Sequence, residues 1–209
     1  MAISDVKLPE GVNAHEFKSP VLLAEGLALN VAKQLSEALA ARGNAVLVVS
    51  GGRSPVAFFQ HLAKQELDWS KVVVTLADER WVPVEHADSN AGLLKQYLLK
   101  GPAAKAQFLS LYSAAANVEQ AAEQADRLLA ELPPIDVLVL GMGDDGHTAS
   151  LFPDSPNLVE ALQADGTRRC WPMLAPSVPR QRLTMSRALL ASARVTTTFD
   201  QSSSCLARC

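Results

Sequence analysis

The chain has 209 residues, of which 48% are hydrophobic and 20% are charged. This composition is that of an ordinary globular domain, and the length is sufficient to bury one sizeable core. The formal net charge of -3 at pH 7 excludes the broad basic surface that nucleic acid or an anionic membrane selects. We therefore expect no nucleic-acid partner and no membrane partner, while a local cationic pocket for a small anion stays compatible with the charge.

The N-terminal sequence and the cysteines indicate neither a secreted protein nor a metal site. The N-terminal sequence MAISDVKLPEGVNAHEF lacks the basic and apolar regions of a secretory signal, and no apolar run is long enough to span a bilayer. A cytoplasmic protein is expected. The cysteines, Cys170, Cys205 and Cys209, have no histidines at metal-ligand spacing, so we expect free thiols and neither a disulfide framework nor a metal site.

The first predicted elements are a helix and a buried strand. Apolar residues recur at helical spacing over residues 21–42, and Gly43 is well placed to end the helix. Residues 45–49, AVLVV, form a short continuous apolar run typical of a strand covered on both faces. SGGRSP follows, with Ser54 as a candidate N-cap and Pro55 as the first residue of the next helix.

The same alternation continues along the chain. Residues 72–76 predict a second strand, and Ser89 is a candidate cap for the helix after it. A fourth helix is expected from Asn117 to about Leu132, and a third strand over residues 135–140. Strands that alternate with helices predict an α/β fold, in which a mostly parallel sheet lies between helices on both faces.

Three unusual segments directly follow the three predicted strands: SGGRSP, DERWVP and GMGDDGH. In open parallel sheets, ligands bind outside the carboxyl ends of the strands. We therefore expect the three loops to converge on one crevice and to form a single active site.

The third loop contains Gly141, Gly143 and Gly146 in a GxGxxG pattern. A dinucleotide site is disfavoured, because Asp144 and Asp145 place negative charge where a pyrophosphate would lie. The glycines fit a tight turn instead. His147 follows them, and a histidine at a strand end beside two carboxylates can serve as a base near neutral pH, although a structural histidine is the alternative.

The first two loops offer groups for an anion. In SGGRSP, Gly51 and Gly52 free the backbone amides, and Arg53 and Ser54 can donate further hydrogen bonds to a phosphate, although an ordinary strand-to-helix turn is equally compatible. In DERWVP, Asp78 can orient a partner, and Arg80 can hold an oxyanion or a phosphate.

Together, VVSGGRSP, TLADERWVPVEHADSN, VLVLGMGDDGHTASLFPDSP and QRLTM resemble the 6-phosphogluconolactonase family, in its order and at its spacing, from about residue 21 to residue 194. Glucosamine-6-phosphate deaminases share the fold, but the ASLFP continuation favours the lactonases. The resemblance implies a three-layer α/β/α, Rossmann-like fold. It also implies hydrolysis of 6-phospho-D-glucono-1,5-lactone to 6-phosphogluconate, in the oxidative pentose phosphate pathway, without a metal or an organic cofactor.

The resemblance also implies roles for individual residues. His147 would be the general base and acid. Our own candidates for stabilising the oxyanion are Arg80 and the amides of the Gly143–Gly146 turn, which includes Asp145. The phosphate would bind to the SGGRSP loop and to Arg182 of QRLTM, which lies on a further strand.

The C-terminal part departs from the family pattern. Where an apolar strand and a phosphate-binding lysine are normal in the family, the chain reads VTTTFDQSSSCLARC. We expect one domain over residues 1–194, an irregular segment over 195–209, and a monomer. Two alternatives stay open: a sugar-phosphate deaminase or isomerase with an acidic base in DER, and a phosphosugar-binding protein without turnover.

Overall fold

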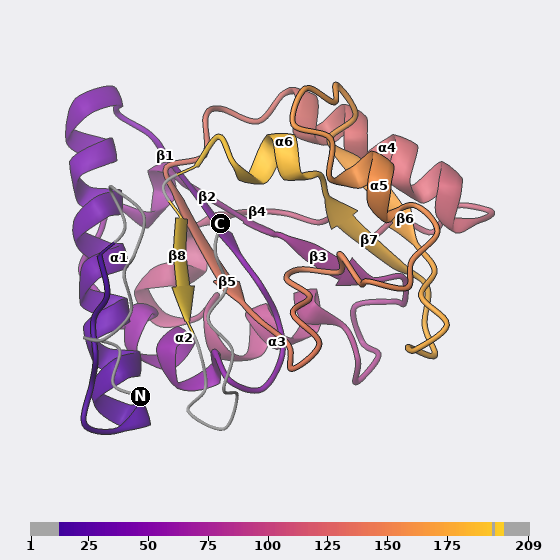
Figure 1. Ribbon diagram of the computed structural model, residues 1–209. Helices are drawn as coiled ribbons and strands as arrows, with labels where there is room; N and C mark the ends of the chain where they lie inside the picture. Colours follow the sequence, from indigo (N-terminus) through magenta and orange to yellow (C-terminus); the bar gives the residue numbers. More distant parts are fainter. Residues whose placement is uncertain (1–12, 194, 199–209) are drawn as a thin grey trace.

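A five-stranded parallel sheet forms the centre of the molecule (Figure 1). The structure is a computed structural model and describes residues 13–193 and 195–198. The strand order is β4-β2-β1-β5-β8, and the strands are β1 (Ala45–Val49), β2 (Val72–Leu76), β4 (Gln107–Leu109), β5 (Val137–Gly141) and β8 (Val195–Thr198). All five residues of β1 are buried, as expected for a strand with neighbours on both sides and helices above and below.

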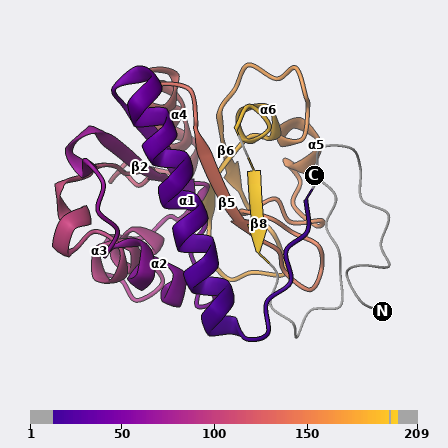
Figure 2. The same ribbon diagram turned by 90° about the vertical axis from the view of Figure 1, so that its left-hand side faces the viewer.

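The helices flank this sheet. They are α1 (Pro20–Arg42), α2 (Val56–Leu62), α3 (Asn90–Tyr97), α4 (Val118–Ala130), α5 (Leu158–Ala161) and α6 (Arg187–Leu190). Short 3-10 helices occur at Trp69–Lys71 and Gly101–Lys105. Helix α1 packs on α2 and β1. Because β5 is added beside β1 on the side away from β2 and β4, right-handed crossovers place α4 on the opposite face of the sheet from α2 and α3. Helix α1 lies to the left of the sheet in Figure 1 and α4 to its right, and Figure 2 shows α1 in front of the sheet.

A second, three-stranded antiparallel sheet extends the fold beside the site. Its order is β3-β7-β6, with β3 at Asp78–Arg80, β6 at Cys170–Met173 and β7 at Arg182–Met185. Helix α4 packs against β6 and β7. In the register of this sheet, Arg80 stands opposite Arg182, so the pairing of β3 with β7 brings two distant arginines together.

The α/β fold class and most of the predicted elements are confirmed. Ser19 caps α1, Gly43 ends it in a left-handed conformation, and Ser89 and Asn117 cap α3 and α4. The predicted cap of α2 is wrong. Pro55 occupies the N-cap position without a side-chain hydrogen bond, and the Ser54 side chain is exposed, because the loop turns one residue later than the Ser-Pro pattern suggests.

The irregular conformation predicted from residue 195 onward is also wrong for Val195–Thr198, which form strand β8. This strand pairs in parallel with Leu138–Gly141 of β5. The physical reason is that the open edge of β5 offers unpaired backbone groups, and valine and threonine favour extended backbone. The remainder of the predicted irregular segment, with Cys205 and Cys209, lies outside the described residues.

Candidate active site

The three loops predicted to converge are joined to one another through β3. The third loop reaches β3 where the Ser150 hydroxyl donates to the Asp78 carboxylate at 2.6 Å. The first loop lies against Asn90, whose side-chain amide donates to the Asp78 carbonyl at 3.0 Å. A Cβ atom on Gly51 would stand 2.0 Å from Asn90 Oδ1, so only glycine allows this close approach. The three loops are therefore linked through β3, while a single crevice lined by all three stays a prediction.

His147 is held by a carboxylate two residues before it. Its Nδ1 lies 2.5 Å from Oδ1 of Asp145, and its backbone N–H donates to the same oxygen at 3.1 Å. Burial opposes ionisation, but the hydrogen bonds from the amide and the ring of His147 hold the pKa of Asp145 below its usual range. An ionised carboxylate at Nδ1 fixes the tautomer in which Nε2 is the proton acceptor.

The glycines of this loop make room for the ring and complete a turn. Gly146 has a φ of 84°, a conformation that glycine adopts without strain. The Gly143 N–H donates to the His147 carbonyl at 2.9 Å, and the Gly146 N–H donates to the Gly143 carbonyl at 3.0 Å. These two amides are thus engaged within the loop, and the expected donation from them to an oxyanion does not fit this conformation.

Replacing Gly143 by alanine should displace the histidine ring. The added Cβ would lie 2.3 Å from Cε1 and 2.4 Å from Nδ1 of His147, so the ring must rotate out of place. Misplacing a catalytic group by about 1 Å costs on the order of 10²-fold in rate, and we expect a loss of that size in kcat with little change in the thermal midpoint. Gly141→Ala is the matched control, since its Cβ would meet nothing within 4 Å. Equal losses in both variants would contradict this role of Gly143.

Phe152 connects the histidine to an arginine of the second sheet. The rings of His147 and Phe152 are stacked, with centroids 4.2 Å apart. The Arg182 guanidinium lies 5.1 Å from the centroid of the same Phe152 ring. Phe152 is buried, so it forms a rigid apolar wall that places the histidine and the arginine near one another. The sequence analysis did not identify this role of the ASLFP segment.

Asp78 holds the loop and does not touch His147 in this structure. It is buried, and its carboxylate accepts the Ser150 hydroxyl. The Ser150 amide in turn donates to the Thr184 hydroxyl of β7 at 3.3 Å. The sequence analysis expects Asp78 to orient a partner; in the structure its partner is the side-chain hydroxyl of Ser150, three residues after His147.

Glu79 is a buried acidic residue of β3 that the sequence analysis did not single out. It is fully buried and accepts backbone N–H groups of Arg80, Asn90 and Ala91 at 2.7–2.8 Å, with the Ser89 hydroxyl at 3.3 Å. Burial raises the pKa of Glu79 to about 7, although the three amides oppose the rise. The carboxylate thereby fastens the start of α3 to β3. A charged residue after an apolar strand was the only signal for it.

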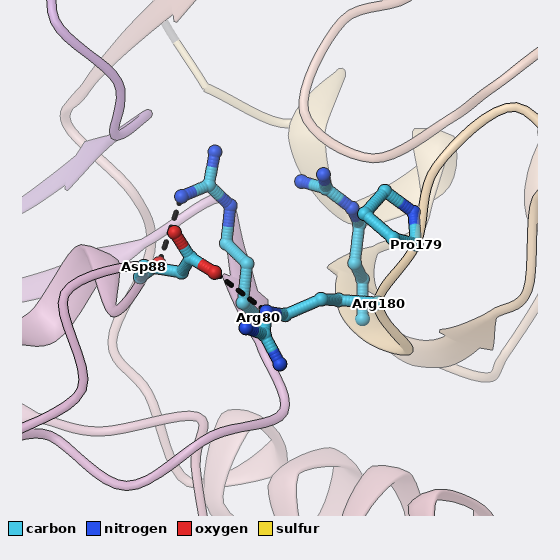
Figure 3. A pocket seen from close by; sticks show the side chains of 5 residues that line it. Arg80, Asp88, Pro179 and Arg180 are labelled. Atoms are coloured by element: carbon cyan, nitrogen blue, oxygen red, sulfur yellow. Dashed lines mark hydrogen bonds and ion pairs between the residues drawn. The ribbon is translucent and has the colours of Figure 1, made fainter.

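Two arginines of the second sheet face a pocket of about 140 Å³, which Asp88, Pro179 and Arg180 also line (Figure 3). Arg80 Nη1 donates to the Asp88 carbonyl at 2.8 Å. Burial, with the charge of Arg80, lowers the pKa of Arg182. Two guanidinium groups brought together by strand pairing are a strong anion site. Residues 51–54 do not line this pocket, and the side chains of Arg53 and Ser54 are exposed.

Within residues 13–193 and 195–198, no three histidine, cysteine or acidic side chains are grouped so as to hold a metal ion. No helix in the same residues combines the length and the apolarity needed to cross a bilayer.

The sequence is similar to known proteins over most of its length. Residues 18–201 match the model of the family described as glucosamine-6-phosphate isomerases/6-phosphogluconolactonase. The chain belongs to this family. It is 63% identical over 93% of its length to a 6-phosphogluconolactonase of Pseudomonas aeruginosa, covering 82% of that protein. A Pseudomonas putida 6-phosphogluconolactonase is also 63% identical, over 92% of this chain and 80% of that one.

The fold of the chain is similar to that of a solved 6-phosphogluconolactonase structure. The crystal structure of a 6-phosphogluconolactonase from Shewanella baltica superposes with a TM-score of 0.84 at 41% identity, over 87% of this chain and 78% of that one. The Rossmann-like fold predicted from the family motifs is therefore confirmed.

Proposed function

We propose that this chain hydrolyses 6-phospho-D-glucono-1,5-lactone to 6-phosphogluconate. The observation that carries the proposal is the Asp145–His147 pair, in which a carboxylate 2.5 Å from Nδ1 leaves Nε2 as the base. The family and the names of relatives at 63% identity support the lactone as the substrate. A cytoplasmic location and a monomeric state stay predictions.

The chemistry follows from general acid–base catalysis. His147 Nε2 takes a proton from a water molecule while the water oxygen attacks the lactone carbonyl carbon. The resulting oxyanion is stabilised by the cationic side chain of Arg80, since the amides of Gly143 and Gly146 are engaged elsewhere. The protonated histidine then donates to the ring oxygen as its bond to the carbonyl carbon breaks. The product is an open-chain acid, and His147 returns to its neutral form.

The phosphate acts as a binding handle and takes no part in the chemical step. The amides of Gly51 and Gly52, with Arg53 and Ser54, are the groups that we assign to it, together with Arg182 from β7. Gly52 has a φ of 100°, and this left-handed conformation can turn successive amides toward one anion. Binding energy from the phosphate fixes the lactone carbon near His147.

The deaminase or isomerase alternative would need a free carboxylate in DER as the base. Asp78 is hydrogen-bonded to Ser150, and Glu79 is fully buried with its oxygens occupied. These contacts favour the lactonase. Ammonia release from glucosamine 6-phosphate would support the alternative instead.

The deciding experiment compares a phosphorylated with an unphosphorylated lactone. The disappearance of 6-phosphogluconolactone, generated in situ near neutral pH, should be faster than its spontaneous hydrolysis, and gluconolactone should react at least about 10²-fold less efficiently in kcat/KM, because it lacks the charged handle. Equal efficiencies would refute the phosphate assignment. Binding of 6-phosphogluconate without any acceleration would support the non-catalytic alternative.

A further inference from the structure

The arginine pocket carries more positive charge than its own acidic residue can neutralise. Arg80, Arg180 and Arg182 line it, and Asp88 is the acidic residue among its lining residues. Because arginine stays protonated, these side chains carry three positive charges and one negative charge. The excess of two matches the charge of a phosphate monoester near neutral pH. A pocket of this charge is expected to hold an anion.

Two buried donors in the pocket also lack acceptors. Among the described residues, neither Arg80 Nε nor Arg182 Nε has a hydrogen-bond partner, although both atoms are buried. An unsatisfied buried donor is costly, and a charged one more so. An anionic ligand with several oxygens would relieve this cost.

Asp88 supplies a carboxylate at the rim of the same pocket (Figure 3). Arg180 Nε donates to Asp88 Oδ2 at 2.5 Å, and His86 Nδ1 lies 3.8 Å from the same oxygen while accepting the Asp88 N–H at 3.0 Å. The two side chains of the ion pair are 42% and 48% exposed. Exposed ion pairs contribute little to stability, so this pair can open readily.

We propose that the Asp88 carboxylate is an internal placeholder for a ligand anion, and that Arg180 moves from Asp88 to the anionic group of the substrate or product. Arg180 is then a specificity-determining residue. The inference rests on the proposed function, since that function supplies two such anions: the phosphate, and the carboxylate formed by hydrolysis. Asp88 competes with both for the same guanidinium group.

The placeholder predicts opposite effects for the two halves of the ion pair. Arg180→Gln removes a ligand donor and should raise the Kd for 6-phosphogluconate about 10-fold, as expected for a charge-assisted hydrogen bond. Asp88→Asn removes the competitor and should lower the Kd about 3-fold at low ionic strength. Asp88→Asn leaves the backbone contacts with Arg80 and His86 in place. A purely structural ion pair would instead weaken binding in both variants.

The experiment is calorimetric titration of the full chain and both variants with 6-phosphogluconate, inorganic phosphate and gluconate. The phosphate and gluconate arms identify which anion displaces Asp88. Arg127→Gln and Glu123→Gln are the matched controls, because these residues form an exposed ion pair within α4 and should not alter Kd.

Opposite shifts in the two variants would establish the placeholder. Shifts in the same direction, or no shift with any of the three ligands, would overturn it. A lactonase assay on the same samples separates this outcome from failure of the proposed function. Opposite shifts in a chain without turnover would retain the placeholder and refute the lactonase.

Discussion

Replacement of His147 by alanine is expected to lower kcat for 6-phosphogluconolactone hydrolysis by about 10²–10⁴, the range for loss of a general base. The Asp145 carboxylate holds the His147 ring at Nδ1, and this leaves Nε2 to accept a proton. KM should change little, because the general base acts on the attacking water, whereas the phosphate handle supplies the ground-state binding energy. Steady-state kinetics corrected for spontaneous hydrolysis measure both parameters.

Two further variants make this result specific. Asp145→Asn should lower kcat by up to about 10⁴-fold, the cost of losing the carboxylate that fixes the tautomer of a catalytic histidine, with KM again unchanged. His15→Asn is the control, since His15 is exposed in the segment before α1. Full activity of His147→Ala would show that another residue is the base and would remove the main support for the mechanism.

Glu79→Gln is expected to change how stability depends on pH. Burial raises the pKa of Glu79 from 4.5 to about 7, so between these values the folded chain retains a proton that the unfolded chain has lost. By linkage, this group makes the free energy of unfolding fall as pH rises from about 4.5 to 7, by an amount on the order of 3 kcal/mol. Glutamine does not titrate, so the variant should lack this slope.

Urea unfolding at pH 5, 6, 7 and 8 tests this expectation. The variant should be less stable than the wild type at pH 5. Its side-chain NH2 group would face backbone N–H donors whose hydrogen bonds the carboxyl oxygens of Glu79 accept in the wild type. The difference between the two proteins should shrink toward pH 8. Parallel pH profiles would contradict the raised pKa of Glu79.

The sequence predicted the parallel sheet well because its central strands can be recognised from their own residues. The boundaries of β1 and β2 agree with the apolar runs at 45–49 and 72–76, since strands covered on both faces must be apolar throughout. Strand β8 gave no such signal. Its residues, VTTT, become a strand because β5 offers an open edge, and that edge exists only once the sheet has formed.

The sequence by itself determined that three loops follow three buried strands, that His147 lies in one of them, and that the motifs are those of the family. Local pattern is enough for this, because burial and turn geometry act over a few residues. Only the tertiary structure decided which groups meet: Phe152 between His147 and Arg182, Glu79 at the start of α3, and Arg180 on Asp88. Arg180 and Asp88 are 92 residues apart in the chain, and the pairing of β3 with β7 places Arg182 opposite Arg80, so local sequence could not predict these contacts.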